Sequence, residues 1–316
     1  MNDNSAIIFA LCSHIGEDDR IKPLEPRDWS NLAKKLLERQ MEPKSLLQLS
    51  RAEIRETLEL DDAAFDRLQC LLNREASLTF ALNKLQDAGI FVVTRADSQY
   101  PKRLKNALGN ACPPLFYYAG ELRLLDVPAV GYVGSRSVSE EDLQFTRNTV
   151  AKTVQRGFIV VSGGAKGVDA AAETAAVERG SAAVSFLSDS LTRKIKAPQT
   201  LKALQNKNML LLSAVNPDAG FHAGMAMMRN RHIYIQSQAT VVVKSDYNKG
   251  GTWAGAVDCL KHQWVPVLCR SLPKAPGNQA LIEQGAMPID DHWDGDVNQL
   301  LSSWNTDQPE QISMFT

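Results

Sequence analysis

The sequence predicts an α/β fold: an extended Rossmann-like, doubly wound, mostly parallel sheet preceded by a small helical domain. Short apolar runs alternate with longer helical stretches between Val127 and about Ile289. Several of these runs are apolar throughout, as strands covered by helices on both faces require. Three glycine-containing segments, each next to a basic residue, precede predicted helices, and open α/β sheets bind phosphate groups with such segments.

The helical domain is expected over residues 1–84. Trp29, Leu32 and Leu36 recur at helical spacing, and Ser50 followed by Glu53 is typical of a capping box at a helix start. Small helical units often bind DNA through helix–hairpin–helix turns, but this segment has no Gly-x-Gly hairpin. A role in packing or in protein contact is therefore the favoured interpretation.

The Rossmann-like domain is expected over residues 85–289, and an acidic, flexible tail over residues 290–316. Stretches that are long enough for helices separate most of the predicted strands, which favours parallel pairing. The predicted strands are residues 89–94, 113–118, 129–133, 158–161, 182–187, 209–213, 240–244 and 265–269.

The composition predicts a globular protein of the cytoplasm. The chain is 44% hydrophobic and 22% charged, and no apolar run approaches the length of a membrane span. The apolar stretch 6–12 follows Asp3 rather than basic residues, which argues against a signal peptide. Five scattered cysteines without a Cys-x-x-Cys pair are expected to be reduced thiols, so neither a metal site nor a cofactor is expected.

Charge is distributed unevenly, although the net charge is only −1. Residues 186–252 hold nine Lys and Arg against three Asp and Glu, whereas residues 286–316 hold acidic residues and neither Lys nor Arg. This asymmetry fits a basic binding face with an acidic segment elsewhere, and it fits a plain solvated surface equally well.

The first glycine-containing segment follows the predicted strand 129–133. Gly134 permits a tight turn, the Ser135 hydroxyl can cap the next helix, and Arg136 can hold a phosphate with two hydrogen bonds. The alternative is a plain helix start with a surface arginine.

The second segment, from Ser162 to Asp169, would present a nest of backbone amides at a helix start, with a lysine adding positive charge. Its glycine and lysine positions are Gly163, Gly164, Lys166 and Gly167. Asp169 is expected to cap the helix or to pair with Lys166 or Arg136. The order matches neither the GxGxxG dinucleotide fingerprint nor the Gly-Lys-Ser/Thr of P-loop hydrolases, which disfavours NAD chemistry and ATP hydrolysis.

Two further basic segments follow. Arg229-Asn230-Arg231, if extended, would turn both arginines to one side to neutralise successive phosphates, while Asn230 bonds a sugar or a base edge. Lys249-Gly250-Gly251-Thr252 opens a predicted helix like another phosphate cradle. Phe221 and His222 are candidates to stack on unpaired bases, with core packing as the alternative for Phe221. The segments together indicate a polyanion as the ligand.

In order and spacing, these segments resemble the DNA-processing protein A (DprA/Smf) family. The resemblance runs from about residue 85 to 289, and it also includes residues 97–104, 113–116 and 277–282. It implies a Rossmann-like domain that binds single-stranded DNA without hydrolysing nucleotide, forms a homodimer and, in the family, helps to load RecA during natural transformation. The DNA-contacting candidates that it implies are Arg136, Ser162, Gly163, Lys166, Arg229 and Arg231.

The chain also departs from the family pattern. A histidine expected in the helix after the second segment is absent, a Tyr-Pro is missing from residues 191–198, and Lys249-Gly250-Gly251-Thr252 replaces a Ser-Gly-Ser/Thr crest. The family's C-terminal winged helix is not expected here. A specialised paralogue, for example in defence against mobile DNA, is therefore a further hypothesis.

The last residues are similar to the short peptide by which bacterial proteins dock on the replication sliding clamp. Gln311 would anchor the peptide by hydrogen bonds, and Met314 and Phe315 would fill an apolar pocket. A structureless end is the alternative.

The leading interpretation is a non-enzymatic, single-stranded DNA-binding protein, and two other classes compete with it. Related folds include sensors of nucleotides and nucleoside-monophosphate phosphoribohydrolases. A hydrolase needs a carboxylate beside the ribose, for which Asp169 and Glu173 are the nearby candidates, and neither lies in that family's Pro-Gly-Gly context. The third class is a protein scaffold with degenerate loops.

Overall fold

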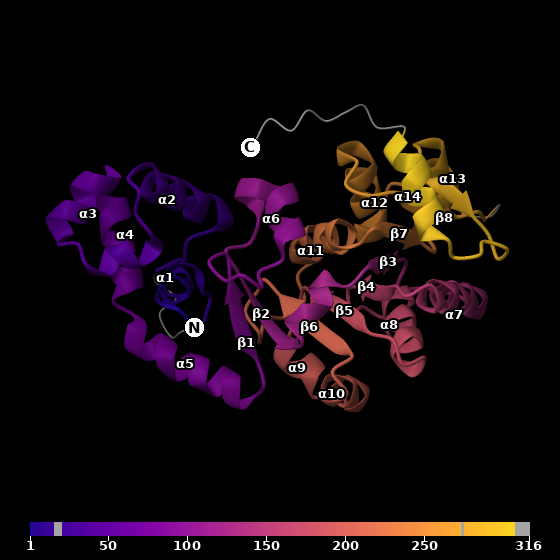
Figure 1. The fold of residues 1–316 in the computed structure, drawn as a ribbon, viewed down its shortest axis with the longest axis horizontal. Helices are drawn as coiled ribbons and strands as arrows, with labels where there is room; N and C mark the ends of the chain where they lie inside the picture. Colours follow the sequence, from indigo (N-terminus) through magenta and orange to yellow (C-terminus); the bar gives the residue numbers. More distant parts are fainter. Residues whose placement is uncertain (16–20, 273–274, 307–316) are drawn as a thin grey trace. The chain divides into compact units, whose positions relative to one another are not determined.

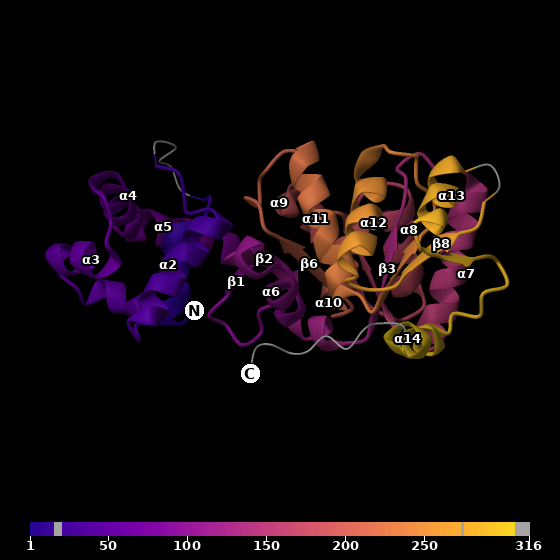
Figure 2. The same ribbon diagram turned by 90° about the horizontal axis from the view of Figure 1, so that it is seen from above.

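The computed structural model describes residues 1–15, 21–272 and 275–306. The nine strands form one sheet in the order β1-β2-β6-β5-β4-β3-β7-β8-β9, which confirms the predicted α/β class (Figures 1 and 2). The chain divides into two compact units. The N-terminal unit comprises Met1–Ala119, Asp189–Ala197 and Leu212–Gly220, and the C-terminal unit comprises Gly120–Ser188, Pro198–Leu211 and Phe221–Thr316.

The N-terminal unit is mainly helical. Its helices are α1 (Asp3–Cys12), α2 (Pro26–Glu38), α3 (Arg51–Leu58), α4 (Asp62–Leu72), α5 (Glu75–Asp87), α6 (Lys102–Leu108) and α9 (Leu191–Ile195), with short 3-10 helices at Pro43–Leu47 and Gly109–Ala111. Strands β1 (Phe91–Thr94) and β2 (Leu115–Gly120) pair antiparallel. The apolar stretch near the N-terminus is core, because Ile7, Ile8 and Leu11 of α1 are buried.

The capping box that the sequence predicts is present at the start of α3. The Ser50 hydroxyl accepts a hydrogen bond from the Glu53 amide at 3.3 Å, and the Glu53 carboxylate accepts one from the Ser50 amide at 2.7 Å. These two bonds satisfy amides that the helix itself leaves without a partner.

The C-terminal unit is the parallel, doubly wound part. Its strands are β3 (Ala129–Val133), β4 (Ile159–Ser162), β5 (Ala183–Leu187), β7 (Ala239–Val242), β8 (Val267–Arg270), β9 (Met287–Ile289) and the first three residues of β6 (Met209–Ser213). Its helices are α7 (Glu140–Gln155), α8 (Val168–Glu178), α10 (Pro198–Gln205), α11 (Ala223–Gln236), α12 (Gly250–His262), α13 (Pro276–Glu283) and α14 (Val297–Thr306), with a 3-10 helix at Leu122–Asp126. Helices α7 and α8 cover one face of the sheet, and α11, α12 and α13 cover the other (Figure 1).

The strand order places a topological switch point next to β3. From β3 the chain continues through β4 and β5 on one side, and it later returns to place β7 on the other side. Both neighbours are parallel to β3, with Val130 opposite Val160 and Gly131 opposite Thr240. Helices that leave β3 and β7 diverge to opposite faces, so the carboxyl ends of these two strands border a crevice where α/β folds bind ligands.

Near the C-terminus the structure differs from the expected tail. Helix α14 occupies Val297–Thr306 within the segment 290–316, and the side chain of Val297 is fully buried. Trp304 of this helix lines a small cavity together with Val267 and Met287. The proposed clamp residues Gln311, Met314 and Phe315 lie outside the described residues. Over the described ranges, no helix is both long and apolar enough to cross a membrane.

Candidate functional site

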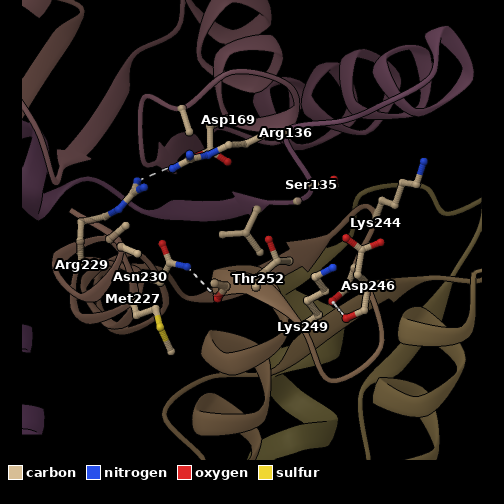
Figure 3. Close-up of a pocket in the computed structure, with 18 of the residues that line it drawn as sticks. Ser135, Arg136, Asp169, Met227, Arg229, Asn230, Lys244, Asp246, Lys249 and Thr252 are labelled. Carbon is tan, nitrogen blue, oxygen red and sulfur yellow. Dashed lines mark hydrogen bonds and ion pairs between the residues drawn. The ribbon is translucent and has the colours of Figure 1, made fainter. Parts of the chain in front are cut away.

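A cleft of about 350 Å³ opens at the carboxyl ends of β3 and β7. It brings together parts of all the basic segments that the sequence singles out (Figure 3). The predicted residues that line it are Gly134, Ser135, Arg136, Asp169, Arg229, Asn230, Lys249, Gly250, Gly251 and Thr252. The predicted residues outside this lining are Ser162, Gly163, Gly164, Lys166, Gly167 and Arg231.

The first and second loops pack directly on each other, and glycine makes this possible. Gly167 has φ +85°, and a Cβ there would overlap the Ser135 carbonyl oxygen. A Cβ on Gly134 would likewise overlap the Val168 side chain. The two glycines therefore hold the backbone after β3 against the start of α8, which fixes the position of Arg136 at the cleft.

The second loop does not present the open nest of amides that the sequence predicts. Ser162 is fully buried, and its hydroxyl donates to the Tyr132 carbonyl at 2.7 Å. The Gly164 amide donates to the carboxylate of buried Glu173 at 2.8 Å. Lys166 is exposed on this loop, next to Ala165, which does line the cleft. The Glu173 carboxylate of the protein itself therefore already balances part of the positive partial charge of the backbone amides in this loop.

Arg229 forms the floor of the cleft on the α11 side. Its side chain is 7% exposed, it pairs with Asp169 at 3.6 Å and it donates to the Phe186 carbonyl at 3.0 Å. Burial raises the pKa of Asp169 to about 6, with Glu173 acting in the same direction and Arg229 opposing it. Asp169 is not the N-cap residue of α8, which is Gly167. Its ion pair is with Arg229, on another helix, and the charge of Arg136 also lowers its pKa.

The Arg229-Asn230-Arg231 segment is helical, so the predicted extended geometry is wrong. All three residues belong to α11, where consecutive side chains project in different directions. Arg231 is exposed and pairs with Asp258 of α12. Asn230 donates its side-chain amide to the Gly251 carbonyl at 2.8 Å, which ties α11 to the first turn of α12.

The third loop gives the cleft its strongest anion-binding feature. Helix α12 begins at Gly250 with Lys249 as its N-cap residue, and no side chain caps that end. Gly250, Gly251 and Thr252 all line the cleft, so the first turn of a thirteen-residue helix borders it. The amides of a first helical turn have no partner within the helix and carry partial positive charge, which favours an anion here.

Two cleft residues that the sequence reasoning missed lie just after β7. Lys244 lines the cleft and pairs with buried Asp142 at 3.1 Å, and Asp246 also lines it. Asp142 is shared with Arg270, whose guanidinium nitrogen lies 2.9 Å from the carboxylate. The sequence feature that could have identified Lys244 is its position at the carboxyl end of a predicted strand. The positive charge of Lys244 is partly neutralised by Asp142.

The cations in and around the cleft therefore differ in whether a carboxylate of the protein already pairs with them. Arg229, Arg231 and Lys244 each make an ion pair with a carboxylate. Arg136, Lys166 and Lys249 make none within the described part of the chain. Arg136 instead lies over the ring of Phe221, with its guanidinium carbon 4.5 Å from the ring centroid. No ion pair with a carboxylate of the described chain competes with a ligand for these three cations, although the charge of Arg136 also lowers the pKa of Asp169.

Phe221 lies at the cleft rather than in the core, so core packing is the wrong alternative for this residue. Its exposed fraction is 53%, and it lines the cleft together with Met227, which is 49% exposed. The site thus combines unpaired cations, a helix N-terminus and an exposed aromatic ring. Among the described residues no cluster of His, Cys, Asp and Glu could hold a metal ion.

The comparison with protein families gives a match over most of the chain. The profile of DNA recombination-mediator protein A matches residues 91–299, which include every residue of the cleft lining. The chain belongs to this family. The family assignment agrees with the resemblance that the loop segments suggest.

Individual members of the family are distant relatives. The DNA processing protein DprA of Streptococcus pneumoniae is 32% identical over 108 residues, which are 33% of this chain and 37% of that protein. The DprA of Bacillus subtilis is 27% identical over 210 residues, which are 65% of this chain and 69% of that protein. The match to the Streptococcus pneumoniae protein thus spans well under half of its length.

Two solved structures of DNA processing protein A share the fold. The one from Streptococcus pneumoniae has a TM-score of 0.64 at 23% identity and covers 84% of this chain and 95% of that chain. The one from Helicobacter pylori, described with its single-stranded DNA binding mode, has a TM-score of 0.54 at 25% identity and covers 69% of this chain and 97% of that chain. The chain therefore has the Rossmann-like fold of these DNA processing proteins.

Proposed function

We propose that this family member binds single-stranded DNA at the cleft and acts without catalysing a reaction on it. The observation that carries the proposal is the convergence of Arg136, Lys249 and the first turn of α12 on one crevice at the switch point. Guanidinium, ammonium and helix-terminal amides are the groups that hold phosphates. The single-stranded DNA binding described for the Helicobacter pylori relative supports the same ligand.

The carboxylates favour binding over hydrolysis. Asp169 forms an ion pair with Arg229, and the Glu173 carboxylate accepts a hydrogen bond from the Gly164 amide. Both carboxylates that a phosphoribohydrolase would use therefore already interact with other groups of the protein. A ribose-side general base needs a carboxylate that reaches the substrate. Glu173 lies outside the cleft lining, and Asp169, which lines the cleft, is already paired with Arg229.

The test is a fluorescence anisotropy titration of single- and double-stranded oligonucleotides. We expect Arg136→Ala and Lys249→Ala each to weaken single-strand binding by about tenfold, because each removes a charge that makes no ion pair within the described chain. Lys166→Ala is expected to act in the same direction. Arg231→Ala is the matched comparison: it removes a charge from α11 that Asp258 already pairs, and it should change affinity little.

Wild-type affinity in both Arg136→Ala and Lys249→Ala, with the variants folded, would reject the cleft as the DNA site. A loss confined to Arg231→Ala would move the site to the outer face of α11. Either pattern is visible in the same titration.

A nucleotide ligand is the second candidate function. The cleft volume of about 350 Å³ lies in the range of small-molecule sites, which favours a mononucleotide-sized occupant. Free nucleoside monophosphates added as competitors distinguish the two: a sensor is displaced from DNA at low nucleotide concentration and is stabilised thermally by the nucleotide. A DNA-binding protein needs several linked phosphates for appreciable affinity.

The finer partner assignments belong to this proposal as well. RecA loading in transformation, a role in defence against mobile DNA, and a homodimer are proposed from the family, and single-stranded DNA binding is the step that they share. Docking on the sliding clamp is proposed from Gln311, Met314 and Phe315. Calorimetry with the clamp tests it, since removal of residues 311–316 should abolish binding without affecting the affinity for DNA.

A further inference from the structure

A second group of cations lies outside the cleft, on helix α6 of the N-terminal unit. Residues 98–120 contain three Lys and Arg and neither Asp nor Glu. The three cations are Lys102, Arg103 and Lys105, which all belong to α6 and are exposed. Every residue of the cleft lining belongs to the C-terminal unit, so the group on α6 is a separate feature of the chain.

Helix α6 is anchored through one side and leaves its cations in solvent. Leu104 is fully buried, and Tyr100, just before the helix, is 3% exposed and donates its hydroxyl to the Pro113 carbonyl. Lys102 and Lys105 are three residues apart, so they are neighbours on the helix surface. The fold therefore holds two ammonium groups close together on an exposed face.

The protein does not neutralise these two lysines. Within the described ranges neither Lys102 nor Lys105 makes an ion pair, whereas Arg39 and Arg67 of the same unit pair with carboxylates. Like charges held this close repel each other and lower stability. An anion bound from outside would remove that repulsion.

Arg95 adds a fourth cation beside α6. Its guanidinium is half-buried and donates to the Ser30 hydroxyl at 3.0 Å, which restrains it. Burial raises the pKa of the Cys112 thiol, and a hydrogen bond with Tyr100 opposes the rise. The charges of Arg95 and Lys105 oppose it as well, so both cations lie near Cys112. Arg95 and the three cations of α6 are termed the α6 surface below.

The α6 surface has charge but no apolar centre. None of residues 95–111, all of which the structure describes, has an exposed large hydrophobic side chain. The core of a protein interface is apolar and rich in aromatic residues, and single strands bind with their bases stacked on aromatic rings. A duplex instead presents a dense row of phosphates, about one charge per 1.7 Å of its axis, with its base faces covered. The surface therefore suits a duplex better than a protein or a single strand.

We infer that the α6 surface binds the phosphate backbone of double-stranded DNA, with Lys102 and Lys105 as its principal contacts. Contacts to phosphates carry no sequence information, so the binding is independent of sequence. The inference goes beyond the proposed function, because it concerns another unit of the chain and another form of DNA.

The test is an anisotropy titration of the full chain with a duplex and with a single strand at low salt concentration. The double variant Lys102→Ala/Lys105→Ala should weaken duplex binding by at least about tenfold and reduce the magnitude of its salt slope by about 1.8, since each phosphate contact on B-DNA contributes about 0.9. Single-strand binding should change less than about twofold. Lys102→Arg/Lys105→Arg should retain duplex binding, because it keeps both charges.

Lys44→Ala/Lys84→Ala is the matched control. It removes two exposed lysines of the same unit that lie outside α6, so it changes the net charge by the same amount. It should leave duplex binding within about twofold of the wild type. Thermal unfolding checks that all variants are folded.

Each other outcome overturns the inference. Wild-type duplex affinity in Lys102→Ala/Lys105→Ala would show that α6 does not contact the duplex, and an equal loss in the control would show an effect of net charge alone. An equal loss for the single strand would mean that the surface holds any strand. Displacement of the duplex by polyglutamate at an equal concentration of charge would indicate an acidic protein as the partner.

The cleft variants separate this inference from the proposed function. Arg136→Ala/Lys249→Ala should lose single-strand binding and keep duplex binding. Loss of duplex binding in that variant would place the duplex at the cleft and refute the α6 surface. Unchanged single-strand binding would refute the proposed function and leave the α6 surface intact.

Discussion

Gly163 illustrates how a residue can belong to a site without touching a ligand. A Cβ at this position would overlap the Arg229 guanidinium, which packs against the glycine backbone while it bonds the Phe186 carbonyl. The glycine thus makes room for a buried cation, and the cation pairs with Asp169. The family resemblance proposes Gly163 as a DNA contact, whereas its place in the structure is behind the cleft wall.

His232 gives a prediction for the pH dependence of stability. Burial, helped by Arg229 and Arg231, lowers the pKa of His232 to about 3, whereas the unfolded chain has an ordinary value of about 6.5. Between these values the unfolded chain binds a proton and the folded protein does not. The contribution of His232 to stability is therefore fully present above pH 6.5 and is lost as the pH falls toward 3.

The measurement compares wild type with His232→Gln by urea unfolding at pH 7.5 and pH 5.0. The wild type should lose about 2 kcal/mol more than the variant over this interval. Asp169, whose raised pKa acts in the opposite sense over the same interval, is common to both proteins and cancels. An identical pH dependence in the two proteins would show that His232 takes up a proton in the folded state.

At the scale of elements, a buried ion network joins the end of β8 and the segment after β7 to the start of α7. Arg270 of β8 is 3% exposed, lies 2.9 Å from the Asp142 carboxylate and covers the ring of Phe145 at 4.4 Å. Lys244, two residues past β7, reaches the same carboxylate at 3.1 Å. Because Lys244 lines the cleft, this network also fixes one wall of the site.

Asp142→Asn should lower the free energy of unfolding by about 3 kcal/mol, since it removes the buried one of the two carboxylates that pair with the buried Arg270 guanidinium. Glu141→Gln is the matched control: Glu141 also pairs with Arg270, but its side chain is 79% exposed, and the loss should stay below about 1 kcal/mol. Denaturant titrations of both variants measure the difference. Equal losses would place the stabilisation in the exposed pair.

The elements themselves were predictable where one physical rule dominates. Strands β3 and β6 have the predicted bounds, because continuously apolar runs can only be buried strands or buried helices and these are too short for helices. The conformation of Arg229-Asn230-Arg231 was not predicted. Its arginines suggested alternation, but the alanine and methionine residues before them favour a helix, and the pairing of Arg229 with Asp169 joins positions far apart in sequence.

At the scale of the molecule, the loops meet because parallel strands that neighbour β3 all end at one edge of the sheet. The alternation of strands and helices along the sequence was enough to predict that these loops meet. It could not predict which of their cations are paired with a carboxylate. Arg136 and Arg231 look alike in the sequence, but Arg136 stacks on Phe221 at the cleft, whereas Arg231 is paired with Asp258 of α12. Which charges bind a ligand depends on partners that only the folded chain supplies.

The salt dependence of DNA binding measures how many cations of the protein contact phosphates of the strand. Each phosphate neutralised on a single strand contributes about −0.7 to the slope of log affinity against log salt concentration, because counterions are released. With Arg136, Lys166 and Lys249 as the contacting cations, the slope should be about −2, and Arg136→Ala should reduce its magnitude by about 0.7. Anisotropy titrations over a series of KCl concentrations measure both slopes. A wild-type slope twice as steep would mean that the paired cations Arg229, Arg231 and Lys244 exchange their carboxylates for phosphates, whereas a slope near zero would mean that the strand is held by its bases alone.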